Sequence, residues 1–447
     1  TLTLTERVNY ICPTAFGSGN YAKINYNANA DGESGYDMQS IFYKSTIGDL
    51  AIGTNVTKLP GWLFYGAYFE FDELLVNVET IGERAFGHAW DGKTAGKLTI
   101  GERVNYIYPA AFSYGNYAVV NYKANADGES EYNTESIFYV SNIGDLIIDE
   151  SVTKLPGWLF YCANFGCDEI TVNVETIGEY AFGYLWNKTD AGTLTVGERV
   201  NMIYPSAFCN GNYKKVNYYA NADGKAKYSS DAMFGSSKIA ELVIGENVTK
   251  APVYLFYNAG FTFQELTVNI ADIKAGAFCK AWSSGTPAIL TIGSGVVQME
   301  EQAFGSIVIE ELYYNSNLTT NVSSYGPFHL ATIRNLNIDE DVEVFAKSLF
   351  YNSKIQDTDI TLNAKEIDEY AFTAAWTSEY PVNLTIGEDV EVINIRAFAN
   401  NYINHLQYNA KNAAPTTKAN GYNSPFNTAT ITELSLGDTV ERLNAYT

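Results

Sequence analysis

The chain has 447 residues, of which 46% are apolar and 14% aromatic, and 51 acidic against 28 basic side chains give it a net charge of −23. A chain so rich in aliphatic and aromatic residues can bury a large core, which excludes intrinsic disorder. Nucleic acid is a poor partner because so acidic a surface repels phosphate, and no run approaches the roughly 20 consecutive apolar residues of a membrane span.

The first predicted element is a strand at Leu2, and the phrase that begins there returns along the chain. Residues 2–11 recur almost unchanged as residues 98–107 and 194–203, and with more drift from Leu290 and Leu384. Self-similarity at a fixed period of about 96 residues indicates a repeat architecture. The super-repeats start near residues 2, 98, 194, 290 and 384.

Each 96-residue block divides into four units of about 24 residues, each opening with a short apolar strand. In the second block these strands begin at Leu98, Val120, Leu146 and Ile170. Continuing this count from Leu2 to Leu434 predicts nineteen strands. A phenylalanine closes nearly every unit: Phe16, Phe42, Phe64, Phe86, Phe112, Phe138, Phe160, Phe182, Phe208, Phe234, Phe256, Phe278, Phe304, Phe328, Phe350, Phe372, Phe398 and Phe426.

One such unit cannot bury its apolar face alone, whereas stacked units can. The first and third residues of each strand point to one side, and the later Val, Leu and Phe must reach the same interior from the opposite wall of a coil. Turns rich in Asn and Gly, such as residues 113–116 and 125–128, are expected to close the coils.

The repeated phrase resembles the BspA-like leucine-rich repeat. Residues 384–398 (Leu-Thr-Ile-Gly, then Val390, Ile393 and Ala397-Phe398), residues 174–182 and residues 151–156 carry this resemblance, which covers essentially the whole chain. It implies one right-handed leucine-rich-repeat β-solenoid over residues 1–447, mainly β and irregular, with one short strand per coil and about 18–19 coils. The four unequal units of each block depart from the nearly uniform family repeat.

The middle residue of each strand should point outward and form one long β face. These residues are Thr3, Asn25, Ala51, Leu75, Thr99, Asn121, Ile147, Thr171, Thr195, Asn217, Val243, Thr267, Thr291, Tyr313, Asn337, Thr361, Thr385, Gln407 and Ser435. None of the nineteen is charged, so the charge is expected on the turns and the opposite wall. The candidate binding residues are Thr99, Asn121, Thr171, Thr195, Asn217, Thr267, Thr291 and Tyr313. A neutral strip of this kind suits an extended protein or glycan partner, and equally a plain structural sheet.

The sequence offers no constellation typical of catalysis. His88, His329 and His405 do not recur, have no metal-ligand spacing, and are expected at tolerated surface or loop positions. Paired carboxylates such as Glu300-Glu301 are read as a solvated acidic rim. We therefore expect no enzyme, no cofactor and no metal. The Asn-Ala-Asp-Gly segments at residues 29–32, 125–128 and 221–224 are interpreted as turns, with a weak calcium site in the first two copies as the alternative.

Cysteines and tryptophans leave further alternatives open. The odd number of cysteines, five, excludes a complete set of intramolecular bridges. Cys162 and Cys167 could form a local disulfide, but the favoured interpretation is that the cysteines serve as small buried apolar residues. The tryptophans that recur in step with the core indicate packing rather than sugar stacking: Trp90, Trp186, Trp282 and Trp376, with Trp62 and Trp158 at a second position.

The resemblance implies an extracellular or cell-surface scaffold for adhesion or protein–protein interaction. Its partner would be a host or neighbouring-cell surface protein or glycan, bound through the β face and flanking loops. Carbohydrate recognition through the Tyr- and Trp-bearing loops at residues 114–117 and 180–186 is one alternative, and a passive spacer that displays another domain is the other. Neither end of the chain resembles a capped repeat, so we expect a fragment of a longer protein.

Overall fold

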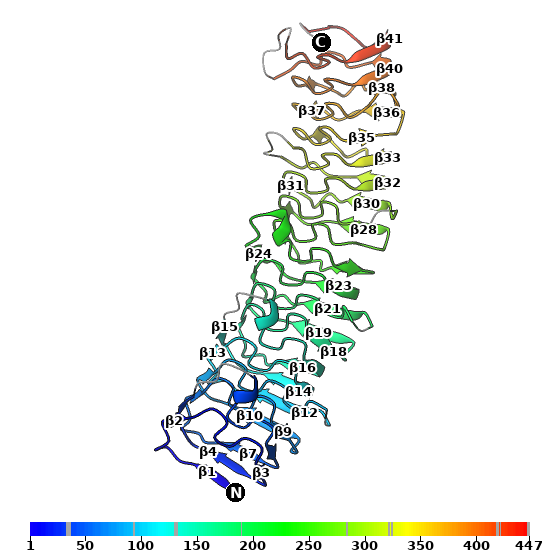
Figure 1. Cartoon of the computed structure of the whole chain (residues 1–447). Coiled ribbons are helices and arrows are strands. Elements are labelled where there is room, and N and C mark those ends of the chain that lie inside the picture. The colour runs from blue at the N-terminus through cyan, green and yellow to red at the C-terminus, as the bar shows by residue number, and fades with distance from the viewer. Residues whose placement is uncertain are drawn as a thin grey trace. The chain divides into compact units, whose positions relative to one another are not determined.

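The computed structural model describes residues 1–32, 37–92, 94–128, 133–188, 190–282, 285–320, 322, 325–416, 420 and 422–444. It forms two compact units, of which unit 1 comprises residues 1–226 and 233–238 and unit 2 comprises residues 227–232 and 239–447. Each unit is a parallel β-solenoid whose successive coils add one strand to the same wall (Figure 1). The solenoid fold predicted from the repeat is confirmed, and a single domain over residues 1–447 stays a prediction.

The β face of unit 1 is built from ten strands. They are β1 (Leu2–Leu4), β4 (Ile24–Tyr26), β7 (Leu50–Ile52), β10 (Glu73–Val76), β12 (Gly96–Ile100), β14 (Asn116–Tyr122), β16 (Asn142–Ile148), β19 (Glu169–Val172), β21 (Gly192–Val196) and β23 (Asn212–Tyr218). In unit 2 the β-face strands are β26 (Leu242–Ile244), β28 (Glu265–Val268), β30 (Ala288–Ile292), β32 (Val308–Tyr314), β33 (Thr332–Ile338), β36 (Asp359–Leu362), β38 (Val382–Ile386), β40 (Tyr402–Tyr408) and β41 (Thr430–Leu436). Each of the nineteen predicted middle residues lies within one of these strands.

A second ladder of two-residue strands runs along another wall of the coils. In unit 1 it consists of β2 (Tyr10–Ile11), β5 (Asp31–Gly32), β8 (Lys58–Leu59), β11 (Thr80–Ile81), β13 (Tyr106–Ile107), β15 (Asp127–Gly128), β17 (Lys154–Leu155), β20 (Thr176–Ile177), β22 (Met202–Ile203) and β24 (Asp223–Gly224). In unit 2 it consists of β27 (Lys250–Ala251), β29 (Asp272–Ile273), β31 (Gln298–Met299), β34 (Val344–Phe345), β37 (Glu366–Ile367) and β39 (Val392–Ile393). The coils therefore hold more strands than the single one expected, because their neighbours also pair on this wall.

The block of four coils has a structural basis in the pairing of the β face. Within unit 1 the strands pair in the orders β1-β4-β7, β10-β12-β14-β16 and β19-β21-β23, so the ladder breaks after the third strand of a block. There the chain pairs instead through β3 (Asn20–Tyr21), β6 (Thr46–Ile47) and β9 (Tyr68–Phe69), or through the start of β16 with β18 (Asn164–Phe165). Unit 2 repeats this arrangement where the start of β33 pairs with β35 (Lys354–Ile355). The remaining short elements are β25 (Lys238–Ile239) and the 3-10 helices η1 (Asp37–Gln39), η2 (Asn133–Glu135) and η3 (Ser229–Asp231).

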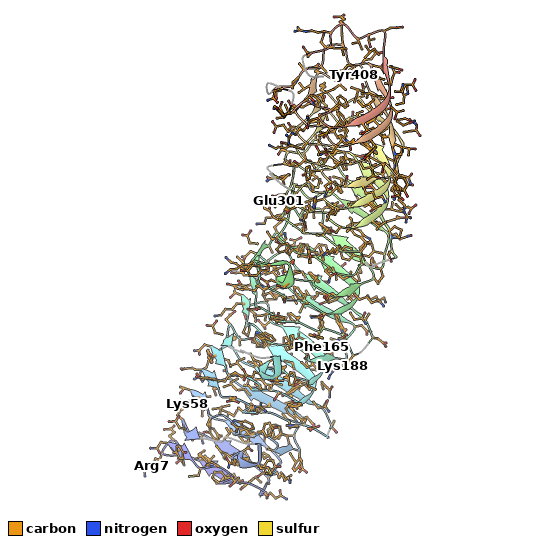
Figure 2. All side chains as sticks on the ribbon, turned by 45° about the horizontal axis from the view of Figure 1, so that its top comes forward. Arg7, Lys58, Phe165, Lys188, Glu301 and Tyr408 are labelled. Atoms are coloured by element: carbon orange, nitrogen blue, oxygen red, sulfur yellow. The ribbon has the colours of Figure 1, made fainter. Side chains whose placement is uncertain are left out.

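The core contains the predicted phenylalanine ladder. In unit 1 ten rings, from Phe16 to Phe234, follow one another with centroids 4.9–5.7 Å apart. In unit 2 eight rings, from Phe256 to Phe426, are 5.0–5.7 Å apart. Only Phe16 and Phe426 are half-buried, and the other sixteen are buried. Side chains fill the space between the walls of the coils (Figure 2), and the phenylalanine ladder forms part of this core.

Residues in the left-handed backbone conformation flank the phenylalanines of the ladder. Trp158 has a φ of 57° and Cys162 a φ of 59°, on either side of Phe160. The Phe160 amide then donates to the Ala181 carbonyl of the next coil at 2.8 Å. A left-handed conformation costs a non-glycine residue roughly 1–2 kcal/mol. The inter-coil hydrogen bonds offset this cost by satisfying backbone groups that would otherwise be buried without partners.

The predicted turn at residues 113–116 differs from the expected one in the role of its glycine. In residues 113–116 it is Tyr114, with φ 56°, rather than Gly115 that takes the left-handed conformation. Gly115 is required for space, because a Cβ there would lie 2.4 Å from the Tyr117 ring.

The interpretation of the Asn-Ala-Asp-Gly segments as turns is wrong, since Asp127–Gly128 is strand β15 and the equivalent pairs are β5 and β24. A Cβ on Gly128 would approach the Ile137 side chain to 2.9 Å, so the glycine permits close packing and does not supply a turn. Asn125 links adjacent coils: its Oδ1 accepts from the Thr153 amide at 2.6 Å and its Nδ2 donates to the Ser151 carbonyl at 3.3 Å. The Asn125 Oδ1, one of the oxygens that the calcium alternative required, therefore already accepts a hydrogen bond.

Candidate interaction surface

In unit 1 the structure places the candidate binding residues in register along the outer side of the β face. Thr99 lies beside Asn121, whose Nδ2 donates to the Thr99 hydroxyl at 3.3 Å. Thr171, Thr195 and Asn217 follow one another on β19, β21 and β23, and Asn217 donates to the Thr195 hydroxyl at 3.2 Å. None of the five is buried. The break between β16 and β19 divides them into two groups.

In unit 2 the remaining three candidates also form one row. Thr267 on β28 pairs with Thr291 on β30, which pairs with Tyr313 on β32. Thr267 and Tyr313 are exposed, with 41% of Tyr313 accessible, and Thr291 is half-buried. Both units therefore present an outward row of hydroxyl, amide and ring groups. Sequence periodicity located every member of this row.

The expectation that all charge lies away from the β face is wrong. The outward residues two positions earlier on the same strands form a charged row beside the neutral one. Lys97 on β12 pairs with Glu73 on β10, with Nζ and Oε1 3.3 Å apart. Glu169 and Lys215 occupy the same row on β19 and β23. The neutral row is thus a stripe flanked by charges, because a strand of four or more residues presents two outward positions and not one.

The recurrent tryptophans have the packing role that their period indicates. Trp90, Trp186, Trp282 and Trp376 are at most 7% exposed. Each indole Nε1 donates to the carbonyl of the residue nineteen positions earlier, at 2.6–3.3 Å. Burying both the ring and its donor leaves nothing for a sugar to contact.

The two loops proposed for carbohydrate recognition are partly core. Tyr117 is 1% exposed and its hydroxyl donates to the Phe112 carbonyl at 3.1 Å, and burial raises its pKa. Trp186 is also buried, so of the residues that suggested these loops Tyr114 and Tyr180 are the more accessible. Tyr117 and Trp186 are therefore not available to a carbohydrate at these loops.

The cysteines are all free thiols, so the Cys162–Cys167 disulfide is absent. Cys162 and Cys167 are half-buried and Cys12 is exposed, whereas Cys209 and Cys279 are buried. Burial raises the pKa of Cys209 to about 11, which keeps this thiol protonated at neutral pH.

The histidines occupy three different environments. His88 lies 2.9 Å from the Asp91 carboxylate and stacks on Tyr114. His405 lies on β40, with Nε2 3.0 Å from the Ser435 hydroxyl. His329 is 7% exposed, which contradicts the expected surface position, and burial lowers its pKa. Within the described ranges no group of three or more His, Cys, Asp or Glu side chains could hold a metal ion.

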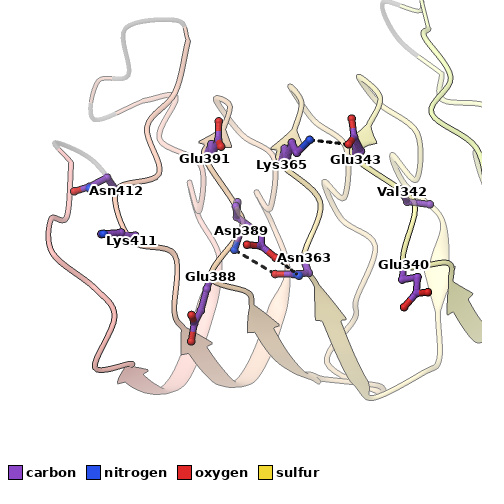
Figure 3. A pocket seen from close by; sticks show the side chains of 11 residues that line it. Glu340, Val342, Glu343, Asn363, Lys365, Glu388, Asp389, Glu391, Lys411 and Asn412 are labelled. Carbon is purple, nitrogen blue, oxygen red and sulfur yellow. Dashed lines mark hydrogen bonds and ion pairs between the residues drawn. The ribbon is translucent and has the colours of Figure 1, made fainter.

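An acidic hollow of about 450 Å³ lies in unit 2, next to the β-face strands β36 and β38 (Figure 3). Two pairs of its polar side chains interact across neighbouring coils. Lys365 pairs with Glu343 at 2.6 Å, and this contact raises the pKa of the Lys365 ammonium. Asn363 Nδ2 donates to the Asp389 carboxylate at 2.7 Å. The hollow is an ordinary consequence of side chains that bridge neighbouring coils.

In the described part of the chain, no helix is long and apolar enough to cross a bilayer.

Comparison with solved structures finds two proteins of low similarity. A leucine-rich repeat protein from Bacteroides ovatus is 11% identical, with a TM-score of 0.39, over 81% of this chain and 92% of that one. The pneumococcal vaccine antigen PcpA is 12% identical, with a TM-score of 0.30, over 94% of this chain and 89% of that one. No curated protein matches the chain in sequence.

Comparison with protein families matches the BspA-type leucine-rich repeat region in six overlapping copies. They cover residues 1–118, 38–164, 89–214, 159–285, 252–378 and 298–424. The match extends over nearly the whole chain and agrees with the repeat phrase and with the coils. The chain therefore belongs to the BspA-type leucine-rich repeat family.

Proposed function

We propose that this chain is a non-catalytic interaction scaffold, secreted or displayed on a cell surface, that binds a partner protein along the β face. The observation that carries the proposal is the in-register neutral row, from Thr99 and Asn121 to Thr171, Thr195 and Asn217 in unit 1. A row of accessible uncharged groups on a rigid sheet costs less to desolvate than a row of charged groups.

The charged row beside it supports the same proposal. Residues such as Glu73, Lys97 and Glu169 lie on the rim of the neutral stripe rather than within it. Interfaces commonly have a core depleted of charge and a polar rim, and charged rims set association rate and partner choice more than affinity. The partner expected from this surface is an extended protein segment or a flat protein face, of the kind that the family resemblance associates with adhesion.

An array of purified extracellular-matrix proteins tests the proposal with the full chain. Asn121→Lys combined with Thr171→Lys places two charges on the neutral stripe and should reduce binding of a captured protein at least tenfold. Asn105→Lys, at an exposed position directly before β13, is the matched control and should leave binding unchanged. Equal loss in the control, or no binding to any protein, contradicts the proposal; the second result favours a passive spacer.

A further inference from the structure

Five polar or aromatic side chains recur at identical places on the second ladder of the first two blocks. They are Asp127, Lys154, Thr176, Glu179 and Tyr204, which match Asp31, Lys58, Thr80, Glu83 and Tyr108 at an offset of 96 residues. Together with Gly128, Leu155, Pro156, Gly157, Trp158 and Gly178, the first set lines a groove of about 530 Å³. The six other lining residues are also identical in the earlier block, although only about two thirds of all positions agree between the two blocks. The groove is observed at the second-block set, and from the identical residues we infer the same groove at the first-block set; each set of eleven residues is called the recurrent groove.

The contacts recur with the residues. Lys154 Nζ lies 2.5 Å from the Asp127 carboxylate, and Lys58 forms the same ion pair with Asp31. The Trp158 ring lies 4.7 Å from Tyr161, as Trp62 lies 4.8 Å from Tyr65. The two copies differ around the eleven residues. Tyr180 stacks on Trp158 at 4.2 Å, whereas Arg84 covers Trp62 at 4.9 Å. The Tyr108 ring contacts Tyr106 at 4.7 Å, and Met202 stands at the equivalent place beside Tyr204.

The glycines of the groove recur for a structural reason. A Cβ on Gly178 would lie 2.4 Å from the Gly157 nitrogen, and one on Gly82 would lie 2.4 Å from the Gly61 nitrogen. Adjacent coils thus approach too closely for any side chain at these positions. This explanation does not extend to the five polar or aromatic residues, none of which is buried.

Unit 2 shows that the second ladder forms without three of those five residues. On its strands β34 and β37 and after β39, Val344, Glu366 and Asn394 stand where Lys154, Thr176 and Tyr204 stand in unit 1. The parallel pairing of these strands is nevertheless intact. Coil formation therefore does not require the lysine, the threonine or the tyrosine, and these side chains are available for another role in unit 1.

The chemistry of the groove fits a sugar. Tyr204 is 39% exposed and Tyr108 45%, so each groove presents an accessible aromatic ring. Beside the ring stand carboxylates and an ammonium, which can accept from and donate to neighbouring hydroxyls, while the apolar face of a pyranose covers the ring. Because the chain carries a net charge of −23, sulfated or phosphorylated glycans are repelled. We propose that each recurrent groove binds a neutral polysaccharide, and that Tyr204 and Tyr108 are the stacking residues.

The spacing of the grooves adds a prediction about ligand length. An offset of 96 residues is four coils, and strands of a sheet are about 4.8 Å apart, so the grooves are separated by about 19 Å within unit 1. A repeating polymer can occupy both at once, which raises its affinity well above that of a short oligomer. In Figure 1 β13 and β15 lie on the other side of the coil from β14 and β16, so the grooves are separate from the β face. This proposal is therefore independent of the protein partner.

The test uses the full chain and three neutral glycan series: β-glucan, mannan and N-acetylglucosamine, each as a trisaccharide and as a long polymer. Affinity electrophoresis and calorimetry should detect one series, and its polymer should bind at least a hundredfold more tightly than its trisaccharide. Tyr204→Ala alone should reduce polymer affinity to the level of a single groove, and Tyr108→Ala together with Tyr204→Ala should abolish binding. Tyr402→Ala, an exposed tyrosine on β40 of unit 2 with 43% of its surface accessible, should change nothing.

Four results would overturn the proposal. One is the absence of binding to every neutral series. Another is polymer binding that survives the double tyrosine variant while its circular dichroism melt matches that of the unmodified chain. The third is a salt-sensitive preference for sulfated glycans. A loss of binding in Asn121→Lys with the grooves intact would also place the sugar on the β face instead.

Discussion

Removing one ring from the phenylalanine ladder should destabilise a few coils strongly and leave the distant coils unchanged. Phe112 is fully buried, and its ring lies 5.4 Å from Phe86 and 5.1 Å from Phe138. A buried Phe→Ala substitution costs about 3–5 kcal/mol. Two stacked neighbours, each contributing about 0.5–1.5 kcal/mol, place Phe112→Ala toward the upper half of that range, at about 4 kcal/mol.

Hydrogen exchange followed by mass spectrometry measures this change coil by coil in the full chain. About 4 kcal/mol corresponds to roughly 10³-fold faster exchange. The effect should be confined to the coils around residues 86–138, because each coil of a solenoid contacts only its neighbours. Phe16→Ala is the matched control: Phe16 is half-buried with Phe42 as its ladder neighbour, so the cost should be about half as large. The reasoning would be refuted if Phe112→Ala lowered the local stability by less than about 1 kcal/mol, or if protection from exchange fell equally throughout unit 2.

Three further predictions concern single groups. Tyr117→Phe should lower the free energy of unfolding by about 1 kcal/mol, because the Tyr117 hydroxyl donates to a backbone carbonyl at 3.1 Å. Tyr122→Phe should be neutral or stabilising, because the buried Tyr122 hydroxyl has no partner among the described residues. Urea unfolding midpoints of the two variants measure this difference. Gly192→Ala should lower the melting temperature and red-shift tryptophan fluorescence, since the new Cβ would lie 2.3 Å from the Trp186 ring; unchanged values would contradict this packing. Burial raises the pKa of the Cys209 thiol from 9.0 to about 11. The contribution of this thiol to the free energy of unfolding is therefore intact below pH 9 and falls by up to about 2 kcal/mol as the pH rises toward 11. Cys209→Ala should flatten this part of the plot of urea midpoint against pH.

The period of the sequence was sufficient to place the β face and the core. The strand alternation put Thr99 and Asn121 outward and Leu98 inward, and the structure has them so. The phenylalanines were found because a solenoid repeats its interior positions with the coil. Such positions are predictable because burial at that place admits few residue types.

The second ladder and the left-handed residues were missed for a common reason. A two-residue strand such as Tyr106–Ile107 is too short to show a period of two. The left-handed positions are taken by residues as different as Trp158, Tyr114 and Val140, and their usual marker, glycine, is absent there. Hydrogen bonds to the neighbouring coil impose their conformation, and the intrinsic backbone preference of a single residue does not predict such bonds.

The recurrent groove left a signal that sequence comparison could have used. Asp127, Lys154 and Glu179 match their counterparts 96 residues earlier, and so do the other eight residues of the groove. Turn and calcium interpretations drew attention to Asp127 alone. The groove became visible only once the coil placed residues 127, 154, 179 and 204 side by side.

Site-specific photo-crosslinking tests most directly whether the β face is the protein-binding surface. A photo-crosslinking amino acid placed at Thr171, which is exposed on β19, should form a covalent adduct with the matrix protein that the unmodified chain retains. The same group placed at Asn105, which precedes β13 on the other wall, should form none. Adducts from Asn105 and none from Thr171 would contradict the assignment of protein binding to the β face.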